Sequence, residues 1–567
     1  GSNRLTFGDG EGNQFIDFRW NVVPDMLVGT GSDRSLTFWR ERDSLGSLVY
    51  GNYVINGNLE LDTAGRENTN LEFSGNYFNG TYMSLGGSTI QGTNNQKINV
   101  QGSGWGNLGD GLGDYVAPSD MTLFPEPPPP PGDWTYGDSY MNNVDARNSH
   151  EVNEEPWCVV NGKIVCGVDV STIGPDNDTP TTVGTQATTS NYQSVIAAAN
   201  PGDTILLRAG TYSAANINIP AGTAGNPITV RNYNGESVQL NGRLTFNNNY
   251  TAIRGVTIHG QGDEHAVFIN RASSSALHHI EVSYCQIWRA KGHNLNITRH
   301  VEQVRAHHNI IDGGTKGNDD NAVRIGHESS GWEPNWIELD HNLIQLLWSG
   351  QNGGGSDGLT LYGHHRVYVH HNNFRHIEGN SNVENAVDIK PPFYTTGNAN
   401  YCEFMYNWIA GSEIPNKAMC IFQGDGADRM HAWWNWWEGN RPITLGDWPQ
   451  NAGHVDWRWN MIPDITGSGN TIRFWDIQNT PSIWYGNYLN NSQLDMNDHD
   501  SHDIEVSGNY FNGTDLALGS STGIAGTNNV KINVTGSGWG AIGSGPGDYV
   551  VASDFELLGS TSDPDPY

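Results

Sequence analysis

The stretch VYVHHNNF, residues 367–374, shows the pattern that decides the fold of this chain. It reads apolar, any residue, apolar, two polar or aromatic residues, Asn, any residue, apolar. Further copies are VRAHHNII (304–311), IELDHNLI (337–344), CEFMYNWI (402–409), MHAWWNWW (430–437), VDWRWNMI (455–462) and IEVSGNYF (504–511). Short alternating strands that return at this period predict a solenoid, in which each coil buries its apolar side by stacking on the next.

One Asn occupies the same place in every copy, and its positions are 22 to 35 residues apart: 309, 342, 372, 407, 435, 460, 487 and 509. Asn tolerates the backbone of a tight turn between two strands. Its amide can also bond to the equivalent Asn one coil away. We therefore expect a structural ladder of Asn side chains and no ligand at these positions.

Upstream of the repeats, SNYQSVIAAANPGDTILLRAGTY (190–212) predicts a short helix followed by a strand. A Ser190/Gln193 capping box would begin the helix, and Pro201-Gly202 would stop it. A helix at this place would cover the open edge of the first coil.

This region resembles the right-handed parallel β-helix superfamily that is typified by pectate lyases. The resemblance runs from Gln193 to about Leu558, and its most specific parts are NPGDTILLRAGTY and GNPITVRNY. It implies an all-β, right-handed parallel β-helix solenoid with an N-terminal capping helix. The superfamily contains lyases, hydrolases, epimerases, adhesins and inert stalks, so the resemblance predicts the fold more firmly than the reaction.

The chain also repeats itself at long range. Residues 1–125 align with about 438–558: FRWNVVPD matches WRWNMIPD, and GTNNQKINVQGSGWG matches GTNNVKINVTGSGWG. The first part of the chain is therefore predicted to be a partial second β-helix without an entry helix. Its first coil would present a bare edge, so we expect further coils from a longer tandem array or from another copy of the chain.

The resulting domain organisation has four parts: a partial β-helix (1–124), a Pro-rich acidic linker (125–184), a complete β-helix (185–559) and a linker-like tail (560–567). The linker begins with PEPPPPPG, which is a semi-rigid spacer. Within it, Cys158 and Cys166 flank an Asn161-Gly162 turn, and a three-residue loop would bring the two sulfurs face to face. We expect a disulfide and an oxidising compartment; two free thiols on a hairpin are the alternative.

Composition limits the partners. The formal net charge is −32, from 61 Asp and Glu against 29 Lys and Arg, which disfavours nucleic acid and anionic membranes. No apolar run reaches the roughly 18 residues that span a bilayer. We expect a soluble protein that is extracellular or at the cell surface.

A second strand recurs in each coil, in NAVRIGH (321–327), DGLTLYG (357–363), NAVDIKP (385–391) and KAMCIFQ (417–423). Side chains alternate between the two faces of a strand, and this alternation directs Val323/Ile325, Leu359/Leu361, Val387/Ile389 and Met419/Ile421 into the core. The outward column would then hold Arg324, Thr360, Asp388, Cys420, Thr444 and Arg473. Tyr362, Lys390, Phe422 and Trp475 would lie beside that column.

The resemblance implies chemistry on this outward face. Lys390 or Arg324 would be the base that removes the proton beside a uronate carboxylate, with Asp388 next to it. Asp357, Glu384 and Asp388 would lie near a Ca²⁺ ion that neutralises this carboxylate. The dense Asp cluster of a calcium-dependent lyase is not found in the sequence, and the strand pattern turns Asp357 inward.

Other interpretations of the same residues remain open. Arg324, Asp388 and Lys390 could form an ion-pair ladder that keeps the coils in register. Tyr362, Phe422 and Trp475 could form an aromatic platform that binds polysaccharide without cleaving it. His308, His341 and His371 precede the Asn in successive coils; since Tyr406, Trp434 and Trp459 continue their column, a stacked ladder is favoured over a metal site.

Two functions follow. The first is an extracellular structural protein whose tandem β-helices stack end to end into a fibre, filament or stalk, with other copies of itself as partners and a polysaccharide-binding face. The second is a secreted polysaccharide lyase, or a related carbohydrate-active enzyme, that acts by uronate β-elimination. The sequence favours the first slightly, because a duplicated incomplete solenoid is explained by an array, whereas the catalytic set is incomplete.

Overall fold

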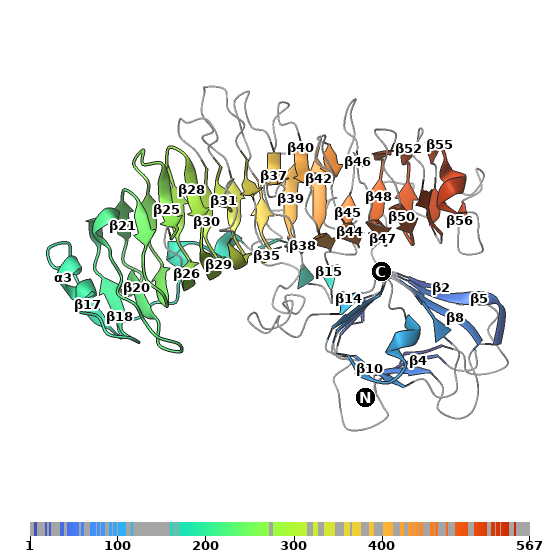
Figure 1. Ribbon diagram of the computed structural model, residues 1–567, viewed down its shortest axis with the longest axis horizontal. Helices are drawn as coiled ribbons and strands as arrows, with labels where there is room; N and C mark the ends of the chain where they lie inside the picture. The colour runs from blue at the N-terminus through green and yellow to red at the C-terminus, as the bar shows by residue number, and fades with distance from the viewer. Residues whose placement is uncertain are drawn as a thin grey trace.

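Most of the chain forms two stacks of parallel strands (Figure 1). The computed structural model describes residues 5–7, 17–19, 22–23, 35–38, 42–50, 52–55, 58–61, 69–74, 76–79, 81–84, 90–92, 95–98, 100–108, 115–116, 159–160, 163–164, 167–168, 170–271, 276–313, 321–326, 334–345, 357–362, 366–375, 385–390, 401–411, 420–424, 429–433, 435–439, 442–445, 454–458, 460–462, 472–474, 482–496, 504–518, 523–527, 529–532, 534–543 and 549–550.

The larger stack is a right-handed parallel β-helix with three sheets of 14, 14 and 12 strands, and most coils contribute one strand to each sheet. The first sheet contains β17 (Thr185–Ala187), β18 (Thr204–Leu207), β20 (Ile228–Asn232), β23 (Thr251–Arg254), β26 (Leu277–Ser283), β29 (Val301–His307), β32 (Asn335–Asp340), β35 (Arg366–His370), β38 (Tyr401–Met405), β41 (Arg429–Trp433), β44 (His454–Arg458), β47 (Ser482–Tyr485), β50 (Ile504–Ser507) and β53 (Ile524–Ala525).

The second sheet contains β19 (Gly210–Ser213), β21 (Val238–Asn241), β24 (Thr257–His259), β27 (Gln286–Trp288), β30 (Ile310–Asp312), β33 (Leu343–Gln345), β36 (Asn373–Phe374), β39 (Trp408–Gly411), β42 (Trp436–Gly439), β45 (Met461–Ile462), β48 (Tyr488–Asn490), β51 (Tyr510–Asn512), β54 (Val530–Ile532) and β56 (Tyr549–Val550).

The third sheet contains β22 (Leu244–Phe246), β25 (His265–Ile269), β28 (His293–Ile297), β31 (Val323–Ile325), β34 (Leu359–Leu361), β37 (Asn385–Ile389), β40 (Cys420–Gly424), β43 (Ile443–Leu445), β46 (Ile472–Phe474), β49 (Gln493–Asp495), β52 (Asp515–Ala517) and β55 (Thr535–Ser537).

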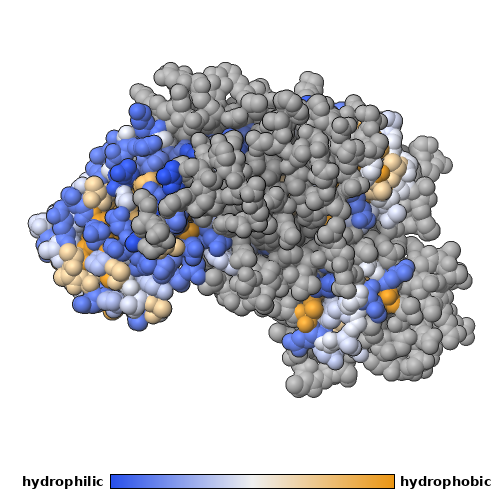
Figure 2. Space-filling model, in the orientation of Figure 1, coloured by the Kyte–Doolittle hydropathy of each residue, from blue (hydrophilic) through white to orange (hydrophobic). Residues whose placement is uncertain are grey.

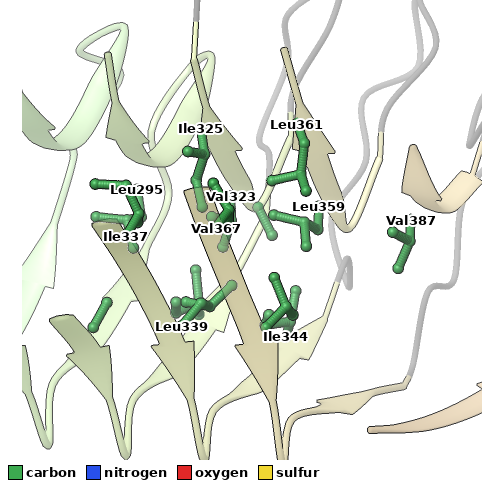
Figure 3. Packing of buried hydrophobic residues seen from close by; sticks show 14 of the residues in the cluster. Leu295, Val323, Ile325, Ile337, Leu339, Ile344, Leu359, Leu361, Val367 and Val387 are labelled. Carbon is green, nitrogen blue, oxygen red and sulfur yellow. The ribbon is translucent and has the colours of Figure 1, made fainter. Parts of the chain in front are cut away.

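The core lies inside the coil, between the three sheets. Figure 3 shows side chains from neighbouring coils stacked there in continuous layers, among them Val323, Leu359 and Val387, which are 0% exposed. Each layer repeats because parallel pairing brings the same strand position of successive coils side by side. The alternation predicted for the third sheet is therefore confirmed for β31, β34 and β37.

The predicted Asn ladder is confirmed. From Asn342 to Asn529, each amide oxygen accepts the backbone N–H and the side-chain N–H of the Asn one coil earlier, at 2.9 to 3.1 Å. Each amide nitrogen also donates to a backbone carbonyl, as Asn372 does to Leu339 at 2.8 Å. The ladder satisfies buried polar groups at every turn between the first and second sheets.

The larger stack carries a cap at each end. Helix α3 (Tyr192–Ala197) lies at the first coil and buries Tyr192 and Ile196 in the core. At the other end, η6 (Trp539–Ile542) buries Ile542, and the Trp539 ring packs against Phe511. The helix is confirmed, but the Ser190/Gln193 capping box is wrong: the N-cap is Asn191, and its side chain makes no capping hydrogen bond.

The smaller stack has its own core, which includes Leu59, Phe73 and Met83. Its first sheet contains β1 (Leu5–Phe7), β4 (Ser35–Phe38), β7 (Asn58–Leu61), β10 (Tyr82–Ser84) and β13 (Gln101–Gly102). Its second contains β2 (Asp17–Arg19), β5 (Arg42–Tyr50), β8 (Thr69–Ser74) and β11 (Ile90–Gln91). Its third contains β3 (Val22–Val23), β6 (Tyr53–Ile55), β9 (Tyr77–Asn79), β12 (Gln96–Ile98) and β14 (Tyr115–Val116).

The two stacks end in the same way, as the sequence repeat predicts. In the smaller stack, η1 (Trp105–Leu108) follows the last Asn, Asn95, whose amide donates to Leu108. In the larger stack, Asn529 donates to Ile542 of η6. The N-terminal stack is thus a partial β-helix that repeats the last coils and the closing turn of the larger one.

An extended segment, residues 167–168 and 170–184, runs along the outside of the larger stack, and we call it the strap. It includes η3 (Val170–Thr172) and η4 (Pro175–Asn177). Its N-terminal end bonds to coils in the middle of the larger stack, since Gly167 donates to Tyr406 at 2.7 Å and Val168 exchanges hydrogen bonds with Asn373. The strap therefore crosses many coils against the direction of the solenoid.

The other end of the strap reaches the first coils. Gly174 donates to His308, and Asn234 donates to Thr181. The fully buried carboxylate of Asp178 binds Arg231 at 2.6 Å and Arg254 at 3.0 Å.

The linker contains the predicted hairpin. Strands β15 (Val159–Val160) and β16 (Lys163–Ile164) pair antiparallel, with Val160 opposite Lys163. This register leaves a two-residue loop, so the predicted three-residue loop is wrong. Cys158 and Cys166 lie outside the described residues, and their disulfide stays a prediction.

Figure 2 shows a largely hydrophilic surface over the described first coils, with hydrophobic side chains in small separate groups. Among the described residues, no helix has the length and apolar character needed to span a bilayer. The caps at both ends of the larger stack do not favour end-to-end stacking, and the fibre interpretation gains no support from the fold.

Candidate active site

The predicted outward column lies on the third sheet. Arg324, Thr360 and Asp388 are paired in register on β31, β34 and β37, and the column continues through Gln423, Thr444 and Arg473. The prediction of Cys420 in this column is wrong, because the register pairs Cys420 with Asn385.

Four side chains of this face come together. The Lys390 Nζ lies 2.9 Å from Asp388 Oδ2. The Tyr362 ring lies between two cations: Arg324 Cζ is 4.5 Å and Lys390 Nζ is 5.3 Å from the ring centroid. Tyr362 and Lys390 each follow a strand of the third sheet directly, so parallel pairing places them on neighbouring coils. The arrangement offers two positive groups around one phenol.

The pKa values of this cluster follow from its burial and charges. Burial lowers the pKa of Lys390, but the charge and hydrogen bond of Asp388 raise it by more, so the net pKa lies above the usual value. Burial raises the pKa of Tyr362, against the opposing effect of Lys390 and Arg324. At neutral pH, Lys390 is therefore an ammonium ion and Tyr362 keeps its phenol proton.

The calcium ligands of the prediction are not brought together by the described residues. Asp357 is 3% exposed, as its inward direction suggested, and its two oxygens accept hydrogen bonds from the Thr360 hydroxyl and the Asn385 backbone. Asp388 is paired with Lys390. Glu384 lies outside the described residues, so calcium stays a prediction and no step is derived from it.

The predicted aromatic platform is found only in part. Tyr362 lies on the face, and the guanidinium of Arg324 is above its ring. Phe422 holds the register position of Val387 and Ile443, both core residues, whereas Gln423 continues the outward column. This register gives no support to an outward Phe422, and Trp475 lies outside the described residues.

A cavity of about 320 Å³ adjoins Arg324 on the same face, and His265, His293, Asn296 and Thr298 line it. The Arg324 Nη1 lies 3.0 Å from His293 Nε2. Sequence analysis did not include these residues in the site. The signal was present in HNLNI (293–297): Leu295 and Ile297 pair with Val323 and Ile325, so extending the column by one coil places Asn296 beside Arg324.

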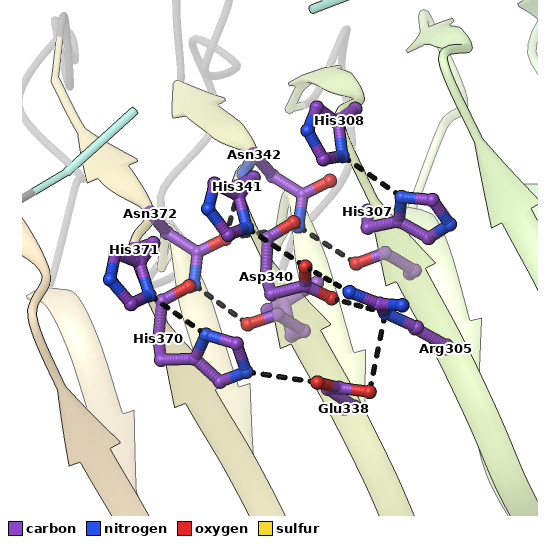
Figure 4. Close-up of polar contacts among 12 residues, drawn as sticks. Arg305, His307, His308, Glu338, Asp340, His341, Asn342, His370, His371 and Asn372 are labelled. Atoms are coloured by element: carbon purple, nitrogen blue, oxygen red, sulfur yellow. Dashed lines mark hydrogen bonds and ion pairs between the residues drawn. The ribbon is translucent and has the colours of Figure 1, made fainter. Parts of the chain in front are cut away.

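A second titratable cluster lies on the first sheet, on the outer side of β29, β32 and β35 (Figure 4). Arg305 bonds to Asp340 at 2.8 and 2.9 Å and lies 3.2 Å from Glu338. His370 bonds to Glu338 at 3.0 Å, and His341 bonds to Asp340 at 2.9 Å.

Three groups in this cluster are close enough to share a metal ion: His341/His370/His371, His307/His308/Asp340 and Glu338/Asp340/His370. The rings of His341 and His371 are stacked at 4.8 Å with 1° between their planes, so their nitrogens do not converge on one point. Arg305 already compensates both carboxylates. The geometry suits a self-compensated network better than a metal centre.

The predicted aromatic ladder is confirmed in this cluster. Tyr284, His308, His341, His371 and Tyr406 stack in sequence, with ring centroids 4.8 to 4.9 Å apart. Trp434 and Trp459 lie outside the described residues. Burial lowers the pKa of His308 to about 3, and it also lowers the pKa values of His341 and His371.

A scan against protein-family models gave no match, and neither did a search of curated proteins. Among solved structures, the chain is similar to the PL6 family alginate lyase AlyGC, with a TM-score of 0.44 and 13% identity over 64% of this chain and 53% of that one. The chain thus spans about half the length of AlyGC.

It is also similar to the pectate lyase Pel9A, with a TM-score of 0.29 and 14% identity over 65% of this chain and 78% of that one. A third likeness is to the GH136 lacto-N-biosidase from Eubacterium ramulus, with a TM-score of 0.28 and 10% identity over 62% of both chains. At this level of identity no reaction is assigned. From its own sheet topology, the chain has the right-handed parallel β-helix fold that is typical of pectate-lyase-like proteins.

Proposed function

We propose that this protein is a carbohydrate-active enzyme that cleaves an acidic polysaccharide by β-elimination on the outward face of the third sheet. The observation that carries the proposal is the grouping of Arg324, Tyr362, Asp388 and Lys390 on neighbouring coils. Two cations beside a phenol on the face of a protein with a net charge of −32 suit an anionic sugar.

Each residue has a role in this proposal. Arg324 binds and neutralises the uronate carboxylate, which makes the adjacent carbon acid easier to ionise. Lys390, after losing its own proton, removes the proton from that carbon. The electron pair forms a carbon–carbon double bond, the bond to the glycosidic oxygen breaks, and that oxygen takes the phenol proton of Tyr362. Asp388 holds the Lys390 ammonium in place.

Such a substrate is found outside cells, so we propose an extracellular or cell-surface location. Calcium is retained as an option that the assay must include, because Glu384 belongs to the predicted ligand set.

The test is an absorbance assay for unsaturated uronate products with polygalacturonate and alginate, each with and without Ca²⁺. Lys390→Ala should lower kcat by about 100-fold or more, as loss of a general base does. Tyr362→Phe should lower kcat while KM changes little. Lys531→Ala serves as the control, since Lys531 lies on β54 of the second sheet, where its side chain donates to Gly543 beside η6 at 2.6 Å. Absence of turnover in the unmodified protein would refute the proposal.

A further inference from the structure

Four residues that line the cavity next to Arg324 each carry a buried polar atom without a hydrogen-bond partner in the described part of the protein. These atoms are His293 Nδ1, Asn296 Oδ1, Thr298 Oγ1 and Asn270 Oδ1, and all four residues line the cavity. His293, Asn296 and Thr298 are only 6%, 6% and 4% exposed. Leaving a buried polar atom without a partner is unfavourable, so four such atoms around one cavity indicate a polar occupant.

The hydrogen-bonding character of the cavity can be derived. A guanidinium only donates, so His293 Nε2 must accept from Arg324, and the ring proton then lies on Nδ1. Burial and the charge of Arg324 lower the pKa of His293 to about 3, so the ring is neutral at neutral pH. The cavity thus presents a donor at His293, acceptors at Asn270 and Asn296, and a hydroxyl at Thr298. Hydroxyl groups both donate and accept, and they match this set.

The cavity is continuous with the candidate active site through a row of rings and cations. Arg243 lies over Phe268 at 5.6 Å, and Phe268 stacks on His265 at 4.7 Å. His265 stacks on His293 at 5.5 Å, and His293 contacts Arg324. Arg324 then lies over Tyr362, beside Lys390.

The charges around the cavity favour an acidic ligand. Arg299 and Arg324 line it, and Glu264, at its exposed rim, is the one carboxylate among the residues described there. His265 adds no charge, because burial lowers its pKa. A ring with several hydroxyls and a carboxylate satisfies both the polar atoms and the arginines.

We propose that this cavity is a binding subsite for one uronate ring of the polysaccharide, next to the ring that reacts at Lys390. Its hydroxyls bond to Asn270, His293, Asn296 and Thr298, and its carboxylate lies toward Arg299, while Arg324 binds the carboxylate of the reacting ring. The inference deepens the proposed function and rests on it for the identity of the sugar.

Thr298→Val is a sharp test, because it removes one hydroxyl at nearly constant shape. Replacing an unsatisfied buried hydroxyl with a methyl group should leave the Tm unchanged or raise it. The Kd for saturated oligogalacturonates or oligoalginates, measured by calorimetry in the Lys390→Ala background to prevent turnover, should rise about 5- to 10-fold, as the loss of a typical hydrogen bond does. A non-glycosylating host is required, since Asn296-Ile297-Thr298 is a glycosylation sequon.

Thr257→Val is the matched control, because Thr257 is a half-buried, outward residue on β24 of the second sheet. It should change neither Tm nor Kd. A Kd unaffected by Thr298→Val, or a lowered Tm with normal binding, would overturn the subsite and indicate ordered water or a structural hydroxyl. If the unmodified protein turns over polyuronate but Thr298→Val leaves the Kd unchanged, only the subsite proposal is refuted. If Thr298→Val weakens oligosaccharide binding but the unmodified protein shows no turnover, only the lyase proposal is refuted.

Discussion

Asp388 controls the protonation of Lys390. The two side chains are 2.9 Å apart, and Asp388 is 1% exposed, so solvent screens their interaction weakly. A lysine that acts as a base must first lose its proton, and the carboxylate opposes this loss. In the proposed mechanism, the same pairing that positions the amine favours turnover at alkaline pH.

We predict that Asp388→Asn moves the rising limb of the pH–kcat/KM profile to lower pH. Without the carboxylate, burial remains as the main influence and lowers the pKa of Lys390. The measurement is kcat/KM for polyuronate between pH 6 and about pH 10. Asp495→Asn is the control, because Asp495 lies on the same sheet in a later coil. An unshifted limb would exclude Lys390 as the base.

Sequence reasoning placed Arg324, Asp388 and Lys390 on one face because only one phase of the alternation is apolar in β31 and β37. It failed at KAMCIFQ, since both phases there are apolar: Met419 and Ile421 in one, Cys420 and Phe422 in the other. When both alternate sets of residues are apolar, the alternation does not show which set faces the core, and a shift of one residue turns every side chain to the other face of the sheet. The proposed subsite could not be predicted from the sequence, because its polar residues come together only when successive coils stack around one cavity.

The Asn ladder is the element that couples neighbouring coils. Asn372 is 0% exposed and connects the coils of Asn342 and Asn407. Its regular spacing made it predictable, because a turn needs the same residue type in every coil. The energetic consequence is that one substitution affects three coils.

We predict that Asn372→Ala destabilises the protein by about 2–4 kcal/mol, since it leaves the buried backbone N–H of Asn342 without an acceptor and the Leu339 carbonyl without the Asn372 donor. Urea unfolding measures this change. Asn216→Ala, at an exposed position of η5 (Ala214–Asn216), should change stability little. Equal effects of the two substitutions would contradict a stabilising ladder.

The histidine ladder predicts a pH dependence of stability. The pKa values of His308, His341 and His371 are lowered in the folded state, so the unfolded chain binds more protons once the pH falls below about 6.5. Stability should therefore decrease from about pH 6.5 down toward the folded pKa values, which is about 3 for His308.

The measurement is the free energy of unfolding in urea at pH 7, 5.5 and 4.5. His371→Phe keeps a ring between His341 and Tyr406 and removes one titrating group, so the loss between pH 7 and pH 4.5 should become smaller. His279→Phe removes another histidine whose pKa burial lowers, at an exposed position outside the ladder that stacks on Tyr250, and it should reduce the loss less than His371→Phe does. A loss that His371→Phe leaves unchanged would assign the pH dependence to other groups.

At the scale of the whole molecule, the strap ties the linker to the larger stack. Asp178 is its anchor, because its buried carboxylate bridges Arg231 and Arg254 on neighbouring coils. The strap could not be predicted, since its acidic, Pro-containing sequence has neither helical nor strand periodicity. Its contacts depend on surfaces that exist only after the coils have stacked.

We predict that Asp178→Asn releases the strap while the coils stay folded, because two arginines lose their shared charge partner. Hydrogen exchange should become faster in residues 170–184 and remain slow in β26, β29 and β32. Glu236→Gln breaks the exposed pair with Arg208 and should leave the strap protected. Uniformly faster exchange throughout the stack would mean that Asp178 supports the whole solenoid.

The strap also constrains the order of events during synthesis. Val168 leaves the ribosome before Asn373, its hydrogen-bond partner 205 positions further along the chain. A closure over such a separation waits for the intervening coils to form. The segment made early thus docks late, and until then Arg231 and Arg254 at the first coils lack their carboxylate partner.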